Sequence, residues 1–177
     1  MDKDDKKKIN SYLSFRLGDE FFALHVSKVY KILEKTEITE VPKAPDYMKG
    51  VINLRGSVLA VIDMRVKFGM SPAEWTKTTC ILVVEAEIEE EKVVVGLLVD
   101  AVQAVQKVND EEILPPPNIG NKFCCDFISG MTRVEDKFYM ILNIDLVLSS
   151  SDLMSIKAVK DARESVEKNE KTDKADE

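Results

Sequence analysis

Few side chains in this sequence have the types and spacing that catalysis or metal binding requires. His25 is the only histidine among the 177 residues, so neither a Ser-His-Asp triad nor a site with several histidine ligands can be assembled. A lone histidine in a strand of aromatic and aliphatic residues is more often half-buried packing. Asp63 and Asp100 each end an apolar strand, where a general base could stand. Asn143 is equivalent to Asp63 in the repeat described below, so we expect both to cap short helices.

Other reactive groups are equally sparse. The seven glycines form neither GxGxxG nor GxxxxGK[ST], so no nucleotide-binding loop is indicated. Cys80, Cys124 and Cys125 are odd in number, and a disulfide between adjacent cysteines would be strained. We therefore expect three reduced thiols, with Cys80 as a small core residue rather than a redox or metal ligand. The sequence indicates no catalytic residue, no metal site and no cofactor, and it favours a binding module over an enzyme.

The charge balance excludes two further classes of partner. The chain has 25 Lys and Arg against 32 Asp and Glu, a formal net charge of −7, which argues against a basic stripe for a nucleic-acid backbone. Residues 2–8 are all charged, and no later apolar run approaches the roughly 18 residues of a membrane span. We therefore expect a cytoplasmic protein that neither binds nucleic acid nor inserts into a membrane.

An ungapped internal repeat organises the chain. Residues 49–68, KGVINLRGSVLAVIDMRVKF, align with residues 129–148, SGMTRVEDKFYMILNIDLVL, eighty positions later. Apolar residues fall on the same registers, and Gly50 meets Gly130 at the head of the repeat. Such a match rarely arises by chance, and it indicates an internal duplication.

A second match extends the duplication. Residues 21–35 align with residues 94–108 at a shift of 73, and Pro42 falls onto Pro115 at the same shift. The order of elements is therefore repeated in two halves of about seventy residues, each too small to bury much surface alone. Two similar all-β modules that share a core are expected, with function on the surfaces between them.

Hydrophobic alternation places the expected strands. YLSFRLG at 12–18 predicts a strand with one buried face, followed by a tight turn into FFALHV. A short turn at 26–28 and the strand YKILEK follow. VINL and VLAVID predict a hairpin whose turn at Arg55 and Gly56 needs a positive φ at the glycine, and residues 64–68 predict a short helix that Gly69 ends.

The second half predicts a similar order and then a change of character. TTCILVVEAE and KVVVGLLVD flank the acidic hairpin tip at 88–91, and three prolines at 115–117 predict a surface loop. Beyond Ser149 the chain is highly charged. Residues 152–166 predict a marginal surface helix with a cap at Ser151 or Asp152, and residues 167–177 predict disorder.

The repeat unit resembles the chemotaxis coupling protein family CheW. That family has a G-x-x-N-L-R-G hairpin, an apolar strand and a D-L/M-R start to a helix, which here are Gly50, Asn53, Leu54, Arg55, Gly56, Asp63 and Arg65. The resemblance continues through LGDEFF, VSKVYKI, VVVGLLVDAV and the ILNID ending, so it covers roughly residues 12–148.

The resemblance implies an all-β fold of two five-stranded SH3-like β-barrels that share an apolar interface, with short helices and a C-terminal helical and disordered tail. We expect a disordered tail at 1–10, a CheW-like domain at 11–150 and the marginal helix and disordered tail at 151–177. The barrels would lie at about 11–75 and 76–150, with exchange of terminal strands allowed.

The resemblance also implies a noncatalytic adaptor. It would couple the cytoplasmic tip of methyl-accepting chemotaxis receptors to the regulatory domain of the histidine kinase CheA in membrane-associated arrays, and it would be monomeric when free. The alternatives are a CheW-like regulatory module of a different two-component signalling system, and an enzyme or small-molecule sensor that uses the cleft between barrels.

Candidate partner-binding residues follow from the motif and the strands. Arg55 places a guanidinium at a hairpin tip, where it meets either a partner carboxylate or an internal one. Lys31 stands where the family typically carries an acidic residue, which indicates a different receptor or kinase set. The apolar candidates either line an exposed groove or belong to the core, and Gly96 would admit a partner's backbone. The full set is Val29, Lys31, Ile32, Gly50, Val51, Asn53, Arg55, Gly56, Gly96 and Val99.

Overall fold

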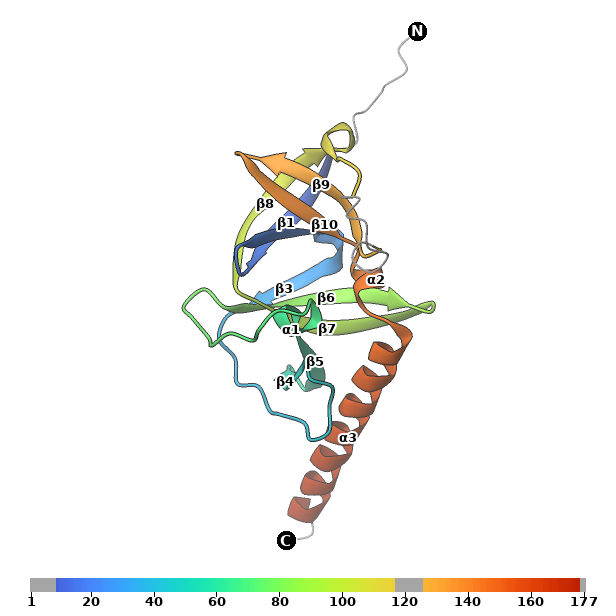
Figure 1. Ribbon diagram of the computed structural model, residues 1–177. Coiled ribbons are helices and arrows are strands. Elements are labelled where there is room, and N and C mark those ends of the chain that lie inside the picture. The colour runs from blue at the N-terminus through green and yellow to red at the C-terminus, as the bar shows by residue number, and fades with distance from the viewer. Residues whose placement is uncertain (1–8, 117–125, 176–177) are drawn as a thin grey trace.

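The computed structural model describes residues 9–116 and 126–175, which form two five-stranded sheets (Figure 1). Sheet A has the strand order β8-β1-β2-β10-β9, with β1 Ile9–Leu17, β2 Glu20–His25, β8 Ala101–Asn109, β9 Ile128–Val134 and β10 Lys137–Leu142. Sheet B has the order β3-β6-β7-β5-β4, with β3 Val29–Leu33, β4 Met48–Leu54, β5 Ser57–Asp63, β6 Cys80–Ile88 and β7 Glu91–Val99. The predicted all-β fold with two five-stranded units is confirmed.

Helices are short apart from the last one. Two 3-10 turns, η1 and η2, and two single-turn helices, α1 and α2, follow strands, whereas α3 is long: η1 Val26–Lys28, α1 Met64–Lys67, η2 Asp110–Glu112, α2 Ile144–Val147 and α3 Ser150–Ala175. Asp63 accepts from the backbone N–H groups of Arg65 and Val66, and Asn143 accepts from that of Asp145. The predicted capping roles of Asp63 and Asn143 are confirmed.

The two sheets exchange strands between the halves of the sequence. Sheet A combines β1 and β2 with β8–β10, and sheet B combines β3–β5 with β6 and β7. The boundary expected near residue 75 therefore does not separate the sheets. The chain crosses from sheet A to sheet B at η1 and returns at Asp100, between β7 and β8.

The duplication reappears in the pairing register. Two strand pairs are parallel, β10 with β2 and β5 with β7. Ala23 lies opposite Ile141 in sheet A, and Gly96 lies opposite Val61 in sheet B. These four residues are counterparts under the two sequence shifts, so the repeat unit folds in the same way on both sides.

Apolar side chains lie in one core shared by the two sheets and in a separate cluster on the other face of each sheet. A shared core receives Phe15 and Phe22 from sheet A, and Ile62, Leu82 and Leu97 from sheet B. The other face of each sheet has its own cluster, around Tyr12 and Ile141 in sheet A and around Leu59, Val61, Ile81 and Val83 in sheet B. β1 is therefore buried on both faces rather than on one as predicted.

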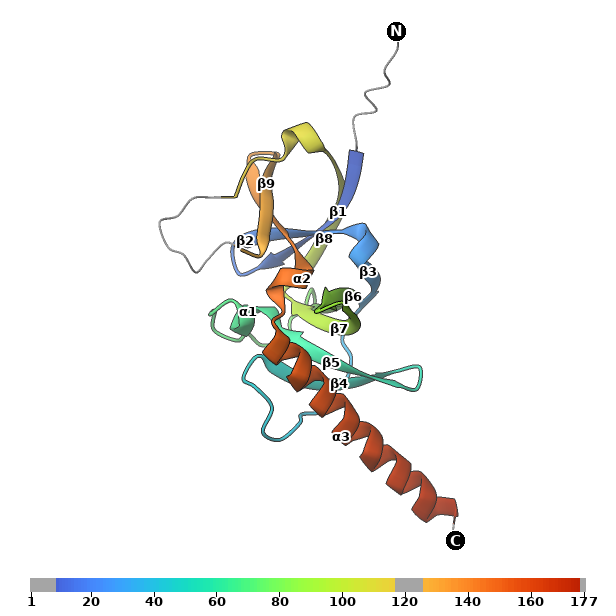
Figure 2. The same cartoon turned by 90° about the vertical axis from the view of Figure 1, so that its right-hand side faces the viewer.

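The terminal segments differ from expectation at both ends. β1 begins at Ile9, so the last two residues of the predicted N-terminal tail are strand. α3 continues to Ala175 instead of ending near residue 166, because its Lys-, Glu- and Ala-rich sequence propagates a helix that tertiary contacts have nucleated. Leu153, Ile156 and Val159 are buried, so α3 docks rather than lying marginally on the surface. Figure 2 shows it crossing β5 and β4.

Both glycines at the head of the repeat allow a loop to approach a strand. Thr39 exchanges backbone hydrogen bonds with Val51 of β4, and Leu114 does the same with Met131 of β9. A Cβ on Gly50 would lie 2.3 Å from the carbonyl oxygen of Thr39, and one on Gly130 would lie 2.5 Å from Cγ2 of Ile113. The repeated glycine therefore serves packing within the chain.

We predict that Gly50→Ala destabilises the protein by about 3 kcal/mol, because a Cβ there meets backbone and φ is +150°. The matched control is Gly56→Ala. Its φ is +84° but nothing lies within 4 Å of an added Cβ, so the expected loss is about 1 kcal/mol. Denaturant unfolding of both variants measures the difference, and equal losses would contradict a close approach at Gly50.

Candidate partner-binding site

The edge strand β3 presents an exposed apolar surface. It pairs only with β6 and ends the strand order of sheet B. Tyr30 and Ile32 are 61% and 45% exposed, and Lys31 is exposed between them. Tyr30 donates a hydrogen bond to Glu85, and this bond raises the pKa of the tyrosine. Val29 differs from its neighbours because it is half-buried and packs against the shared core.

The edge strand β8 is the counterpart of β3 in sheet A. It pairs only with β1 and follows the second crossing of the chain. Val105, which the sequence repeat aligns with Ile32, is 59% exposed, and Val102, which aligns with Val29, packs against the shared core. The first strand after each crossing, β3 or β8, therefore presents one aliphatic side chain to solvent at an equivalent position. Val105 was not among the predicted residues, although the repeat would have identified it from Ile32.

An ion pair fixes the crossing that leads into β8. The Asp100 carboxylate accepts from Nε of Arg65 at 2.8 Å and from Nη2 at 2.5 Å, and from the backbone N–H of Gly18 at 2.7 Å. Burial alone raises the pKa of Asp100, but the hydrogen bonds from Arg65 and Gly18 hold it below its ordinary value. Because Gly18 joins β1 to β2 and Arg65 lies on α1, this carboxylate connects the two sheets.

The other crossing carries the same kind of pair with the charges reversed. Nζ of Lys28 in η1 lies 3.3 Å from Oδ2 of Asp145, and Oδ1 of Asp145 accepts from the backbone N–H of Glu87 at 2.7 Å. Asp145 on α2 is the repeat counterpart of Arg65 on α1. The helix therefore supplies the carboxylate at this crossing and the guanidinium at the other. Both crossings are held by a helix beside a hairpin, and both position the strand that follows.

The hairpin between β4 and β5 presents the predicted arginine. The backbone N–H of Gly56 donates to Oδ1 of Asn53 at 2.9 Å, and both Arg55 and Gly56 have positive φ, 51° and 84°. The positive φ predicted for Gly56 is confirmed, and the Asn53 side chain closes the turn. Arg55 is exposed, and among the side chains that the structure describes, those of residues 10–116, 126–163 and 171, none forms an ion pair or hydrogen bond with it.

Four of the predicted partner-binding residues, Gly50, Val51, Gly96 and Val99, are buried within the chain, so the structure does not present them on an exposed surface. Gly50 lies under the loop at Thr39, as described above. Val99 is 1% exposed in the shared core. A Cβ on Gly96 would meet Ile81 of the neighbouring strand at 2.8 Å, so this glycine faces the chain itself rather than a partner's backbone.

Val51 is buried for a different reason. It is 3% exposed and packs with Val58 and with Val159 of α3. A hollow of about 290 Å³ opens beside it, lined among others by Thr36, Asn53 and Arg163. The charged residues of this segment predicted a marginal surface helix and gave no sign of this cover, although Leu153, Ile156 and Val159 are spaced by three and fall on one face.

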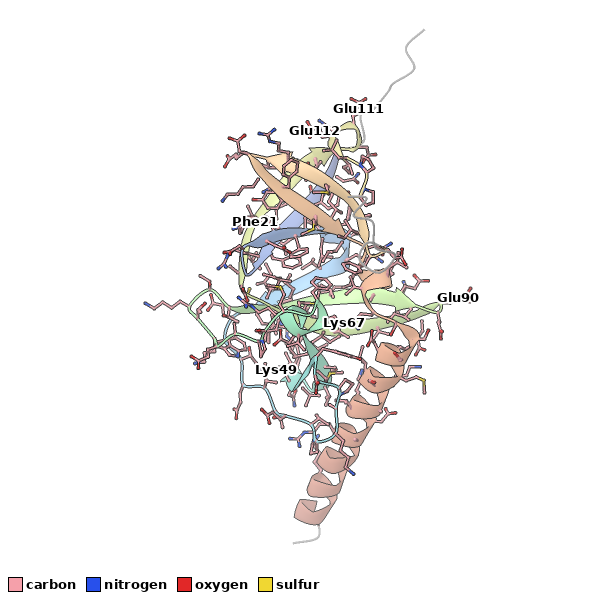
Figure 3. The ribbon with its side chains drawn as sticks, viewed as in Figure 1. Phe21, Lys49, Lys67, Glu90, Glu111 and Glu112 are labelled. Carbon is pink, nitrogen blue, oxygen red and sulfur yellow. The ribbon has the colours of Figure 1, made fainter. Side chains whose placement is uncertain are left out.

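A buried carboxylate anchors the start of α3. Asp152 is 2% exposed and accepts from Nζ of Lys67 at 2.6 Å, from the backbone N–H of Ser149 at 2.7 Å and from the Tyr47 hydroxyl. The Lys67 ammonium also lies 4.3 Å from the centre of the Tyr47 ring. Figure 3 shows Lys67 between α1 and the start of α3. Burial and the bond to Asp152 raise the pKa of Tyr47 to about 12.

The residues first considered for catalysis or metal binding pack within the fold. His25 is half-buried, packs edge-on against Tyr12, and contacts Ser27 and Asn10. Cys80 is buried, which raises the pKa of its thiol, whereas Cys124 and Cys125 lie outside the described residues. Within the described part of the chain, no three His, Cys, Asp or Glu side chains gather as a metal site. No helix there is long and apolar enough to cross a membrane.

Comparisons with known proteins agree with this geometry. The model of a protein family described as CheW-like domain matches residues 11–152. The chemotaxis protein CheW of Rhizobium meliloti strain 1021 is 37% identical over 140 residues, covering 79% of this chain and 88% of that protein. The chemotaxis protein CheW of Klebsiella aerogenes is 29% identical over 148 residues, covering 84% and 87%.

A solved structure shows the same fold. The crystal structure of the scaffolding protein TtCheW from Thermoanaerobacter tengcongensis superposes with a TM-score of 0.71 at 29% sequence identity. The match covers 82% of this chain and 96% of that one. The strand order and the crossings described above therefore belong to a fold already known from a scaffolding protein.

We predict that the anchor of α3 weakens with acid. Burial alone raises the pKa of Asp152, but hydrogen bonds from Lys67, Ser149 and Tyr47 lower it below the ordinary 3.8. A depressed folded-state pKa gives stability that is complete above the unfolded-state pKa and is lost as pH falls through the folded one. Asp152→Asn should therefore cost about 2 kcal/mol at pH 7, and the difference from the parent should shrink below about pH 4.

Chemical unfolding of both proteins between pH 3 and pH 7 measures this difference. The matched control is Asp46→Asn at an exposed aspartate in the loop before β4, which should change stability by less than about 0.5 kcal/mol. A difference between parent and Asp152→Asn that stays constant down to pH 3 would show that the ionised carboxylate is not what anchors α3.

Proposed function

The chain belongs to the CheW-like domain family and has an adaptor role in chemotaxis, and we propose that it couples the cytoplasmic tips of chemoreceptors to the regulatory domain of the histidine kinase CheA. In this role it performs no catalysis and binds its partners through fixed surfaces. It is cytoplasmic and monomeric when free, and it is recruited to membrane-associated receptor arrays through these contacts.

The exposed edge strand β3 is the observation that carries this proposal. Tyr30 and Ile32 project from a strand whose remaining edge is unpaired, and the pairing with β6 fixes the strand rigidly. A rigid row of one aromatic and one aliphatic side chain suits the apolar face of a helix. We assign this surface to the helical receptor tip, with Lys31 selecting the partner by charge.

The hairpin at Arg55 suits the second partner. Its guanidinium is exposed at a turn that Asn53 and Gly56 shape, and no internal carboxylate occupies it in the described structure. A planar guanidinium binds a carboxylate with two parallel hydrogen bonds. We assign this tip to the kinase regulatory domain, whose resemblance to the same fold allows barrel-to-barrel packing.

We predict that Ile32→Glu weakens receptor binding by at least about 2 kcal/mol, roughly 30-fold, because a carboxylate would be desolvated against an apolar partner. The substituted side chain is already 45% exposed, so the melting temperature should remain close to that of the parent. Isothermal titration with a receptor-tip fragment and with a kinase regulatory-domain fragment measures both affinities.

Val29→Glu is the contrasting variant on the same strand. Val29 packs against the shared core, so this substitution should lower the melting temperature strongly and weaken both partners together. If folded Ile32→Glu binds the receptor fragment as the parent does, the assignment of β3 to the receptor is wrong.

A further inference from the structure

A hollow of about 280 Å³ opens on sheet A at the side of β9, away from the edge strands β3 and β8. It lies over β2, β9 and β10, and its lining residues are Asp19, Glu20, Phe21, Met131, Lys137, Phe138 and Met140. Phe138 is 50% exposed, and Lys137 lies with its ammonium 4.8 Å from the centre of the Phe21 ring. Phe21 lies at the side of sheet A in Figure 3. One exposed phenylalanine and two half-buried methionines, Met131 and Met140, therefore line this hollow.

The sequence repeat identifies the same place on sheet B. Met131, Phe138 and Met140 are the counterparts of Val51, Val58 and Ala60, which are 3%, 3% and 2% exposed. The strand registers agree, since Met131 lies opposite Met140 and Val51 lies opposite Ala60. The same positions are thus covered in one sheet and open in the other.

The cover on sheet B is helix α3. It packs along β5, and Val159 forms one buried cluster with Val51 and Val58. Ile156, one turn earlier on the same face, reaches the shared core. Beside this apolar row, Nζ of Lys157 lies 2.5 Å from Oε2 of Glu91, at the start of β7. One amphipathic helix therefore contributes aliphatic residues three apart and a lysine between them.

From this internal comparison we propose that the hollow on sheet A binds an amphipathic helix of another protein. Its chemistry follows from the helix on sheet B: two aliphatic residues three positions apart lie over Phe138 and Met131, and an adjacent lysine or arginine faces Asp19 and Glu20. Those two acids lie at the turn of the β1–β2 hairpin, as Glu91 lies at that of the β6–β7 hairpin.

The chain's own helix does not fill this site. The aliphatic face of α3 is already buried on sheet B, so a second copy could supply it only by exposing Val51 and Val58. Such an exchange would lose as much apolar burial as it gained. The surface is also distinct from β3 and the Arg55 hairpin, so the inference stands independently of the receptor and kinase assignments.

A synthetic peptide with the sequence of residues 149–166, stapled on its exposed face, is the probe. In the full-length chain α3 already covers Val51 and Val58 on sheet B. Because α3 is tethered, its effective concentration there is about millimolar, so the free peptide binds sheet A in preference to sheet B. Methyl NMR of labelled methionine follows Met131 and Met140 in the hollow, with Met154, 72% exposed on α3, as the internal reference.

We expect saturable shifts of Met131 and Met140 with Met154 unchanged. Phe138→Glu should weaken binding at least tenfold, with its melting temperature retained because the side chain is half exposed. Val105→Glu, an equally exposed site on β8, is the matched control and should bind as the parent does. A peptide carrying Val159→Asp should not bind.

Three results would overturn the proposal. The first is no saturable shift of Met131 and Met140 at any peptide concentration. The second is unchanged affinity in folded Phe138→Glu. The third is displacement of Met154 without those shifts, which would mean that the peptide exchanges with α3 on sheet B.

Discussion

Two crossings of the chain between the sheets are the constraint on which the rest of the structure depends. Because the chain leaves sheet A at η1 and returns at Asp100, neither half can close its own sheet. Sheet A takes two strands from the first half of the sequence and three from the second, and sheet B takes three from the first half and two from the second. The pairs Arg65–Asp100 and Lys28–Asp145 hold these crossings. The first strand after each crossing, β3 or β8, lies at an edge of its sheet, where its exposed side chains are available to partners.

The duplication produced two similar surfaces, of which one is covered by α3 and the other is open. On sheet B the outer part of the shared face is covered by α3, which Asp152 fixes through Lys67 and Tyr47. On sheet A the equivalent part is open and enriched in larger, softer side chains, with Phe138 and Met131 in place of two valines. A contiguous apolar patch on a surface often marks an interaction site. The two faces therefore indicate one internal and one external helix partner.

The sequence predicted the features that depend on local geometry. Turn conformation at Gly56, capping by Asp63 and Asn143, and the repeated strand order all follow from spacing and residue type. It did not predict which apolar residues are exposed, because alternation in a sheet with two buried faces gives no polar side. For that reason Gly96 was expected to face a partner, whereas it faces Ile81 of the neighbouring strand. The docking of α3 was missed because Val159 is buried against β4 and β5, a placement that the sequence of the helix itself does not reveal.

The exchange of strands between the two halves predicts that neither sheet folds without the other. Trp75, the single tryptophan, packs against the interior cluster of sheet B, and the Met140 methyl lies on β10 of sheet A. Denaturant unfolding followed by tryptophan fluorescence and by the Met140 NMR signal should give one midpoint and one slope, because the shared core and the exchanged strands are lost together. Two separated transitions, with one sheet native while the other is unfolded, would contradict this account.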